Sequence, residues 1–323
     1  IGVSFVLFYL AIVKDYEPLL LLPIGAGCML ANLPLSPMIA EDGMLKVLYH
    51  MGVGNEMFPL LVFVGQVPRH QRGRDAFQEL DLTAVFGSIC KWVHELDDPQ
   101  RAPDVVARAW ATALSGRPGP VMIGLPEDML TEPCEAPVLP APPPVHAGVS
   151  AATADEVRTL LAAAQRPVVI AGGSRWSDAA IDLLPDAFPG VPLVAAFRRQ
   201  DLIDHRLPAF AGSLGLGADP ALVARVASAD VIVAIGDRLD DSTTNGFTLL
   251  DPAGGAAALV HVHPDPDELG RVFTPRLAIA AEPEAFLQAM GPATPPTAAQ
   301  PTAAQPAAAW RSEARAGYEA WGR

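Results

Sequence analysis

Cysteine is scarce in this sequence. Its 323 residues include 3 cysteines, Cys28, Cys90 and Cys134. They lie far apart, and neither a Cys-x-x-Cys pair nor a Cys/His metal-site spacing occurs among them. A disulfide framework is therefore not indicated, and the odd count favours reduced thiols in a cytosolic protein.

Basic residues are also in short supply, with 22 Lys and Arg against 36 Asp and Glu, which gives a formal net charge of −14. This balance argues against nucleic acid and anionic membrane surfaces as partners. No basic segment precedes a short apolar core and a small-residue cleavage site, so no signal peptide is predicted. The sequence begins with Ile1 rather than methionine, and we expect a fragment or a fusion of a longer protein.

Charge is absent from two stretches near the N-terminus. Residues 1–13 carry none, and residues 18–40 carry none around a dense apolar core. The second stretch approaches the roughly 20 residues that cross a bilayer, and its Gly and Pro residues are common in membrane helices. We therefore predict an apolar, membrane-like helical segment over residues 1–64, with membrane contact through residues 1–40. A buried helical hairpin in a soluble core is the alternative.

The character of the chain changes within residues 64–81. An apolar run at 58–64 is long enough for a buried strand, which Pro68 prevents from continuing as a central strand. Three basic residues follow the strand, where open parallel sheets bind ligands: Arg69, Arg72 and Arg74. Amide groups and an aromatic face are added by Gln66, Phe77 and Gln78. An ordinary exposed basic loop is the alternative, and on local pattern alone it is preferred.

Helical and strand patterns alternate in the rest of the chain. A helix is predicted at 104–114 and a strand at 121–125, and a Pro-rich linker runs to residue 145. In residues 151–292 the expected strands are 167–171, 192–197, 231–235, 259–263 and 277–280, and the expected helices are 155–164, 177–188, 220–229 and 282–290. This alternation predicts an α/β fold with a parallel sheet flanked by helices, Rossmann-like in character. Residues 293–323 read as an Ala/Pro-rich linker and a helix that starts a further domain.

Glycines mark the places where this domain allows a close approach. Gly172, Gly173 and Gly236 end strands, so a ligand or another backbone segment could come near. The run at 212–217 is rich in glycine, but it is weak evidence for a phosphate cradle. No G-x-G-x-x-G pattern occurs, so the dinucleotide fingerprint is absent.

Two titratable pairs stand out in the same domain. Asp240 and Asp241 could serve acid–base chemistry or a metal, but Arg238 offers an ion-pair partner and a solvated loop is preferred. His261 and His263 are two residues apart on a predicted strand and therefore face one side. No third ligand has convincing spacing, so we predict no metal site.

Part of the N-terminal sequence resembles a known family. Residues 9–25, Tyr-Leu-Ala-Ile-Val-Lys-Asp-Tyr-Glu-Pro-Leu-Leu-Leu-Leu-Pro-Ile-Gly, and residues 55–61, Asn-Glu-Met-Phe-Pro-Leu-Leu, are similar to the β subunit of sodium-pumping oxaloacetate decarboxylase. The similarity ends near Val64, before the membrane segment that carries the family's sodium-handling aspartate. The resemblance implies a membrane-subunit remnant over residues 1–64, and no transport function is carried over.

The sequence after Val64 resembles thiamine diphosphate enzymes, most closely acetolactate synthase and its relatives. Four words occur in the family's order: Gly65-Gln-Val-Pro, Arg74-Asp-Ala-Phe-Gln-Glu, Lys91-Trp, and Gly116-Arg-Pro-Gly-Pro-Val with Leu125-Pro-Glu-Asp. The resemblance covers residues 65–323. It implies that residues 65–145 are the second half of a pyrimidine-binding domain with its linker, and that residues 151–292 are the central domain.

This resemblance assigns candidate binding residues. In the first part, Gln66, Phe77 and Gln78 fall where the family lines its substrate channel and cofactor cleft. His70 and Glu127 replace the family's usual arginine and lysine, which puts the anionic 2-oxoacid specificity of acetolactate synthase in doubt.

In the central domain, the resemblance places four residues at flavin-contacting regions: Gly172, Gly173, Arg238 and Asp265. Ser242 stands where the flavin-binding branch has arginine, and Leu214 departs from that branch's Met-His word. FAD binding therefore stays open and is not favoured.

Two cofactor-binding features of the family have no counterpart in this sequence. One is the early glutamate that activates the aminopyrimidine ring, and the other is the Gly-Asp-Gly…Asn word that holds diphosphate and Mg²⁺. Thiamine diphosphate and Mg²⁺ are thus implied as cofactors, with an incomplete site. We assign no catalytic residue, leave open whether the chain is itself an enzyme, and expect it to be inactive alone.

The resemblance further implies a homodimer or tetramer in the parent family, and a cytoplasmic location for residues 65–323. Two alternatives remain. One is a membrane-subunit remnant of a sodium-translocating oxaloacetate decarboxylase, and the other is a nucleotide- or flavin-binding module.

Overall fold

The computed structural model describes residues 9–10, 14, 61–140, 142–143, 145–255, 257–292 and 304–321, with side chains from residue 309 in the last range. The membrane-like helices expected in residues 1–40 lie outside these residues, apart from positions 9, 10 and 14. No helix in the described part of the chain combines the length and apolarity needed to cross a membrane. The chain divides into two compact units, which are described separately.

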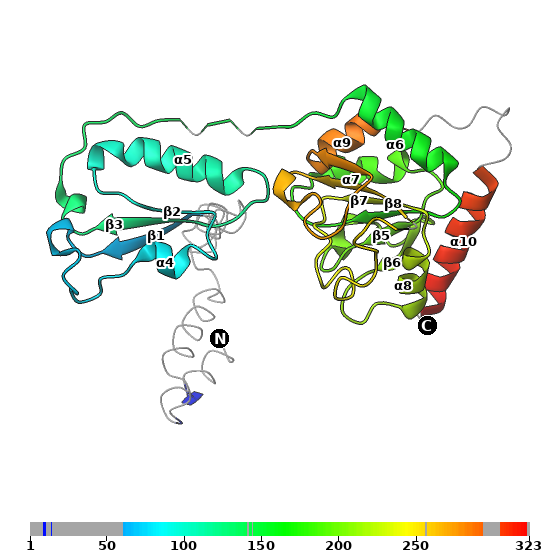
Figure 1. Cartoon of the computed structure of the whole chain (residues 1–323), viewed down its shortest axis with the longest axis horizontal. Helices are drawn as coiled ribbons and strands as arrows, with labels where there is room; N and C mark the ends of the chain where they lie inside the picture. The colour runs from blue at the N-terminus through cyan, green and yellow to red at the C-terminus, as the bar shows by residue number, and fades with distance from the viewer. Residues whose placement is uncertain are drawn as a thin grey trace, which may run out of the picture. The chain divides into compact units, whose positions relative to one another are not determined.

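The first unit contains a three-stranded parallel sheet with the order β1-β3-β2. Its elements are β1 (Leu61–Gln66), α4 (Leu82–Phe86), β2 (Trp92–Glu95), α5 (Ala102–Leu114) and β3 (Val121–Pro126). Figure 1 shows α5 and α4 on opposite faces of the sheet. Strand alternation explains this, because Val121 and Ile123 pack with α5 while Gly124 makes room for Leu82 of α4.

The second unit contains a six-stranded parallel sheet with the order β6-β5-β4-β7-β8-β9. The strands are β4 (Pro167–Ala171), β5 (Leu193–Ala195), β6 (Phe210–Ser213), β7 (Val231–Ile235), β8 (Ala258–His263) and β9 (Leu277–Ala280). The helices are α6 (Ala151–Ala163), α7 (Asp178–Ala187), α8 (Pro220–Ala227), α9 (Pro283–Met290) and α10 (Ala304–Trp321). Both units thus have a parallel sheet flanked by helices, which is the fold class that the sequence predicts.

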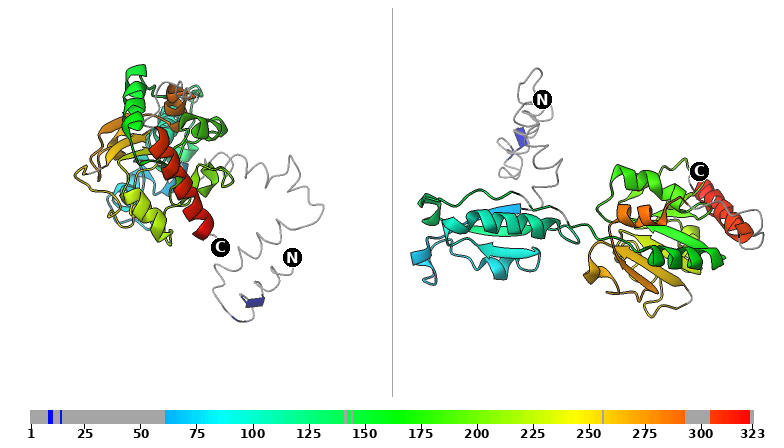
Figure 2. Two further views of the ribbon diagram at one scale, coloured as in Figure 1. Left: turned by 90° about the vertical axis from the view of Figure 1, so that its right-hand side faces the viewer. Right: turned by 90° about the horizontal axis from the view of Figure 1, so that it is seen from above.

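Alternating strand residues divide the core of this unit into two layers. Val169 and Ala171 of β4 pack with α6, α7 and α9, while Val168 and Ile170 pack with α8 and α10. The strands are therefore buried on both faces, which explains their continuous apolar runs. Figures 1 and 2 show α10 beside α8, and α10 also contacts β6.

The bounds of most elements agree with the sequence expectations, and the differences are local. β1 extends through Gly65 to Gln66, two residues beyond the expected end. β2 and β6 were not predicted. The sequence predicts that the C-terminal helix starts a further domain, but α10 packs within the second unit. There Trp310 Nε1 donates a hydrogen bond to the carbonyl of Pro167 at 3.1 Å.

Candidate functional site

The strand order of the second unit creates a switch point between β4 and β7. From β4 the chain runs outward through β5 and β6, and it then returns to the other side of β4 for β7, β8 and β9. Open α/β sheets bind ligands outside the carboxyl ends of the strands at such a point. Gly172 and Gly173 follow β4 there, and Gly236 and Asp237 follow β7.

The glycines at the switch point allow one backbone turn to approach another. Gly173 has φ +68°, and a Cβ added to it would lie 1.8 Å from the carbonyl oxygen of Gly236. A Cβ on Gly236 would lie 2.6 Å from the carbonyl oxygen of Gly172. Of the two roles that the sequence left open for these glycines, the geometry demonstrates the close approach of backbone to backbone.

Asp237 is the carboxyl group at the centre of this arrangement. Its side chain is buried, and its Oδ1 accepts a hydrogen bond from the amide of Leu239 at 2.7 Å. Burial raises the pKa of Asp237 to about 6, although the hydrogen bond from Leu239 acts in the opposite direction. Sequence reasoning missed this residue, and the only available signal was an acidic side chain directly after a buried strand.

Two further side chains hold the turn after β4. Trp176 Nε1 donates a hydrogen bond to the carbonyl of Gly172 at 2.7 Å. Arg199 donates to the carbonyl of Gly173 and pairs with Asp201, with a distance of 3.0 Å from Nη2 to Oδ2. An indole, a guanidinium and the Asp237 carboxyl group thus surround the turn after β4 at the switch point.

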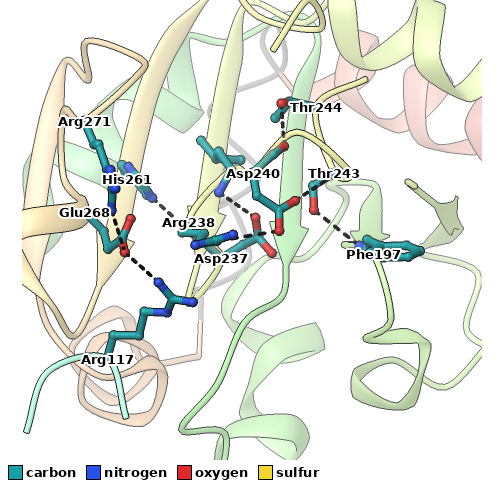
Figure 3. Close-up of polar contacts among 11 residues, drawn as sticks. Arg117, Phe197, Asp237, Arg238, Asp240, Thr243, Thr244, His261, Glu268 and Arg271 are labelled. Atoms are coloured by element: carbon teal, nitrogen blue, oxygen red, sulfur yellow. Dashed lines mark hydrogen bonds and ion pairs between the residues drawn. The ribbon is translucent and has the colours of Figure 1, made fainter. Parts of the chain in front are cut away.

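Asp240, the first of the two aspartates after β7, organises its own loop (Figure 3). Arg238 Nε lies 3.6 Å from Asp240 Oδ2, which is the ion pair that the sequence suggested. Asp240 Oδ1 accepts a hydrogen bond from the amide of Thr243 at 2.9 Å, and the Asp240 carbonyl accepts one from Thr244 Oγ1 at 2.6 Å. Asp240 therefore has a structural role in the turn, and Asp241 is exposed.

His261 and His263 are both buried on β8, with ring centroids 6.3 Å apart. His261 Nε2 lies 2.8 Å from the carbonyl oxygen of Asp237 and donates to it, while His263 Nδ1 accepts from the amide of Asp265 at 3.0 Å. Burial lowers the pKa of both imidazoles. Within the described ranges, no group of three or more His, Cys, Asp or Glu side chains is arranged to hold a metal.

The carboxylate of Asp265 is occupied by main-chain donors. Its Oδ1 accepts from the amide of Asp267 at 3.1 Å, and its Oδ2 accepts from the amide of Arg117 at 3.3 Å. Arg117 belongs to the short stretch 115–118 that clusters with the second unit, and its guanidinium contacts Glu268 (Figure 3).

The glycine-rich run at 212–217 begins in the last two residues of β6 and borders two pockets. A Cβ on Gly215 would lie 2.5 Å from Phe197 Cδ2, so this glycine permits tight packing. One pocket, of about 370 Å³, brings Leu214 and Ser242 together with Thr243. These are the two positions at which the sequence departs from the flavin-binding pattern. The other pocket, of about 300 Å³, lies between the loop and α10.

In the first unit, Gln66 is buried at the carboxyl end of β1. Its Nε2 donates to the carbonyl of Leu80 at 2.7 Å, and its Oε1 accepts from the amide of Val67 at 2.9 Å. Its amide therefore fastens the loop that carries Phe77 and Gln78 to the strand end. Phe77 is 89% exposed and Gln78 is exposed with φ +68°.

The basic residues after β1 are less available for a ligand than the sequence suggested. Arg69 Nε pairs with Asp128 Oδ2 at 2.9 Å, and its guanidinium also contacts Glu132. Arg72 pairs with Glu95 of β2. The main-chain amide and guanidinium of Arg69 lower the pKa of Asp128. At this edge, carboxylates neutralise two of the three arginines expected to provide positive charge.

Comparisons with known proteins agree with both resemblances. Residues 154–290 match the family described as thiamine pyrophosphate enzyme, central domain, and residues 1–67 match the family described as Na⁺-transporting oxaloacetate decarboxylase beta subunit. The acetolactate synthase large subunit of Parasynechococcus marenigrum is 33% identical over 66% of this chain and 35% of its own length.

Two further relatives give the same pattern. A probable acetolactate synthase large subunit of Methanocaldococcus jannaschii is 30% identical over 71% of this chain and 40% of its own length. The acetolactate synthase isozyme 2 large subunit of Escherichia coli is 27% identical over 73% of this chain and 43% of its own length. The matched region thus spans less than half the length of each of these three relatives.

Proposed function

We propose a function on the premise that residues 154–290 form a central domain of the thiamine pyrophosphate enzyme family. In this proposal the chain is part of an acetolactate-synthase-like enzyme that makes or breaks a carbon–carbon bond beside the 2-oxo group of a 2-oxoacid. The observation that carries the proposal is the coincidence of the matched residues with the six-stranded unit. Thiamine diphosphate supplies the electron-accepting group for this chemistry.

The proposal assigns the units as follows. Residues 65–145 are the second half of a pyrimidine-binding domain with its linker, residues 151–292 are the central domain, and residues 1–64 are a separate apolar segment. In this proposal Gln66 supports the cofactor cleft of the family, because its hydrogen bond to the carbonyl of Leu80 holds the loop that carries Phe77 and Gln78. These two side chains are exposed and offer surfaces to a ligand. The parent enzyme is a cytoplasmic homodimer or tetramer.

None of the described residues belongs to a Gly-Asp-Gly…Asn word, which holds diphosphate and Mg²⁺ in the family that the chain resembles. We therefore assign no catalytic step to them and expect the chain to lack turnover by itself. Calorimetric titration with thiamine diphosphate and Mg²⁺, together with pyruvate and benzoylformate assays, tests this. The expected result is no saturable binding and no turnover. Turnover that disappears in Gln66→Ala would show that a complete site exists here.

A nucleotide- or flavin-binding role for the central unit is the second candidate. The observation that favours it is the switch point between β4 and β7, with a pocket of about 370 Å³ nearby at Leu214 and Ser242. Asp237 and Asp240 are acidic groups at this edge of the sheet. Their carboxylates disfavour an anionic ligand such as a diphosphate. Equilibrium dialysis against FAD, ADP and adenosine should therefore rank adenosine at least as high as FAD. Preferential retention of FAD would contradict that ranking.

A membrane-subunit remnant is a third candidate, supported by the match of residues 1–67. In this case residues 1–40 contact the membrane, while the second unit remains independent of lipid. The test compares flotation with neutral liposomes for the full chain and for a polypeptide of residues 61–323. Flotation of the full chain alone supports the candidate, whereas equal behaviour of the two polypeptides eliminates it.

A further inference from the structure

The pocket between the glycine-rich loop and α10 is distinct from the switch point. It measures about 300 Å³ and is lined by β6, by the loop after it and by the last turns of α10. Neither Asp237 nor the two glycines after β4 contribute to it. A pocket of this size falls at the lower end of the range for small-molecule sites.

Aromatic side chains dominate one wall of the pocket. The rings of His205 and Phe210 are stacked with centroids 4.2 Å apart and an interplanar angle of 4°. Tyr318 of α10 meets Phe210 edge-on, with centroids 4.9 Å apart. Because offset stacking and edge-to-face contacts are the favoured aromatic geometries, a flat ring placed here would extend an existing arrangement.

Large apolar side chains at the same pocket remain in contact with water. Leu216 in the loop is 82% exposed, and Trp321 near the end of α10 is 58% exposed. A ligand in contact with both would remove apolar surface from water, which is favourable. Phe197 lines the pocket as well, so aromatic or apolar groups reach it from three segments of the chain.

The charges around the pocket disfavour an anionic ligand. None of its lining residues is Lys or Arg, and Asp219 contributes a carboxylate that accepts a hydrogen bond from the amide of Ala221 at 2.9 Å. The nearby guanidinium of Arg315 is occupied, since it donates to the carbonyl of His205 at 2.8 Å and pairs with Glu319 at 2.7 Å. An anion would thus meet a negative charge without a lysine or arginine on the wall.

A cationic ligand is not favoured either. Asp219 caps the first turn of α8, so its negative charge already interacts with main-chain N–H groups and with the positive end of the helix dipole. The polar groups of Gln200 and Ser213 remain to orient a ligand by hydrogen bonding at its edge. Together these features favour a flat, uncharged ring system with one hydroxyl or ring nitrogen.

We propose that this pocket binds a neutral, planar aromatic compound of one or two rings. The ring lies against His205 and Tyr318, whose rings cover the buried Phe210, and its polar edge faces Gln200 or Ser213. Nothing in this proposal depends on thiamine diphosphate, on FAD or on the activity of the parent enzyme.

The test uses the full chain and four naphthalene-based or saturated probes, with binding followed by calorimetry. The probes are 2-naphthol, the anionic 2-naphthoate, the cationic 2-naphthylmethylammonium ion and the saturated alcohol decahydro-2-naphthol. We expect 2-naphthol to bind with 1:1 stoichiometry and each of the other three to bind at least tenfold more weakly. Tyr318→Ala should weaken 2-naphthol binding at least fivefold, whereas Phe247→Ala, which removes a ring outside this pocket, should leave it unchanged.

Because Tyr318 also helps to dock α10, Ser213→Phe provides a second variant that fills the pocket from β6. Thermal melting verifies that each variant is folded. Loss of 2-naphthol binding in folded Ser213→Phe supports the proposal even if Tyr318→Ala does not fold. The proposal is overturned if 2-naphthol shows no saturable binding up to millimolar concentration, if Ser213→Phe binds it normally, or if a charged or saturated probe binds equally well.

Discussion

His261 Nε2 lies 2.8 Å from the main-chain oxygen of Asp237, so an imidazole on β8 holds the turn that carries the buried carboxyl group after β7 (Figure 3). Both side chains are almost fully buried, with exposed fractions of 2% and 6%. Burial disfavours the charged form of each group, which raises the pKa of the acid and lowers that of the imidazole. Their effects on stability therefore have opposite dependence on pH.

Replacing Asp237 with asparagine should stabilise the second unit at neutral pH. The pKa of Asp237 in the folded state, about 6, lies above the ordinary value of 3.8. The stability that the protonated Asp237 contributes is therefore complete below pH 3.8 and is lost as pH rises through 6. At pH 7 the ionised, buried carboxylate then costs on the order of 3 kcal/mol. Asparagine retains an acceptor for the amide of Leu239 without the charge.

Urea unfolding of Asp237→Asn and of the native chain between pH 4 and 7 measures this effect. The difference in unfolding free energy should grow with pH across the interval. Asp251→Asn is the matched control, because Asp251 is exposed and accepts a loop hydrogen bond from the amide of Ala253. A constant difference across the interval, or destabilisation by Asp237→Asn at pH 7, would refute the role of burial.

His261→Gln should make the unit less sensitive to mild acid. The pKa of His261 is lowered in the folded state from an ordinary value of 6.5, so the unfolded chain binds the proton more readily. The destabilisation caused by this histidine therefore begins as pH falls below about 6.5 and increases until the folded pKa is reached. Glutamine can donate to the carbonyl of Asp237 without titrating.

Thermal melts of His261→Gln at pH 5 and pH 7 provide the measurement. The native chain should lose more melting temperature between these values than the variant does. His205→Gln is the control, since His205 is exposed. If His261→Gln and the native chain lose the same melting temperature, another group must account for the acid sensitivity.

The sequence was sufficient to predict the bounds of three strands of the large sheet. β4, β7 and β9 have the expected bounds because short Val-, Ile- or Leu-containing runs stand between turn or helix signals. β2 and β6 were missed, since Trp92–Glu95 contains two titratable residues and Phe210–Ser213 contains a glycine. Their strand conformation depends on pairing with β3 and β5, which is tertiary information.

The candidate site shows the same division between local and tertiary information. Gly172, Gly173 and Gly236 could be predicted to end strands, but their packing against one another required the strand order. Asp237 has no distinguishing local pattern, and its raised pKa arises only after several elements bury it. Arg69 appeared to be free positive charge in the sequence, yet its partners Asp128 and Glu132 lie about sixty residues away in the chain.

Arg315→Ala should loosen α10 from the second unit. Arg315 Nη1 donates to the carbonyls of His205 and Leu207, at 2.8 and 3.2 Å, and these groups precede β6. Losing charge-assisted hydrogen bonds to main-chain carbonyls costs roughly 1–3 kcal/mol. Hydrogen exchange of α10 amides should accelerate, while Arg311→Ala on the same helix should have a smaller effect. Equal protection in the two variants would show that apolar packing alone holds the helix.

A polypeptide of residues 145–321 should be more stable than one of residues 145–292. Both contain the six strands, but only the longer one contains α10, whose Ala314 is buried against α8 and β6 and whose Trp310 donates to Pro167. Without the helix, the apolar face of α8 and the edge of β6 are exposed to water, and about 25 cal/mol is lost for each Å² of apolar surface uncovered.

Circular dichroism melts of the two polypeptides give the comparison. We expect both to melt cooperatively, with the longer one several degrees higher, and its advantage should fall in Arg315→Ala. Identical melting temperatures would indicate that residues 151–292 are a self-sufficient domain and that α10 contributes nothing to its core.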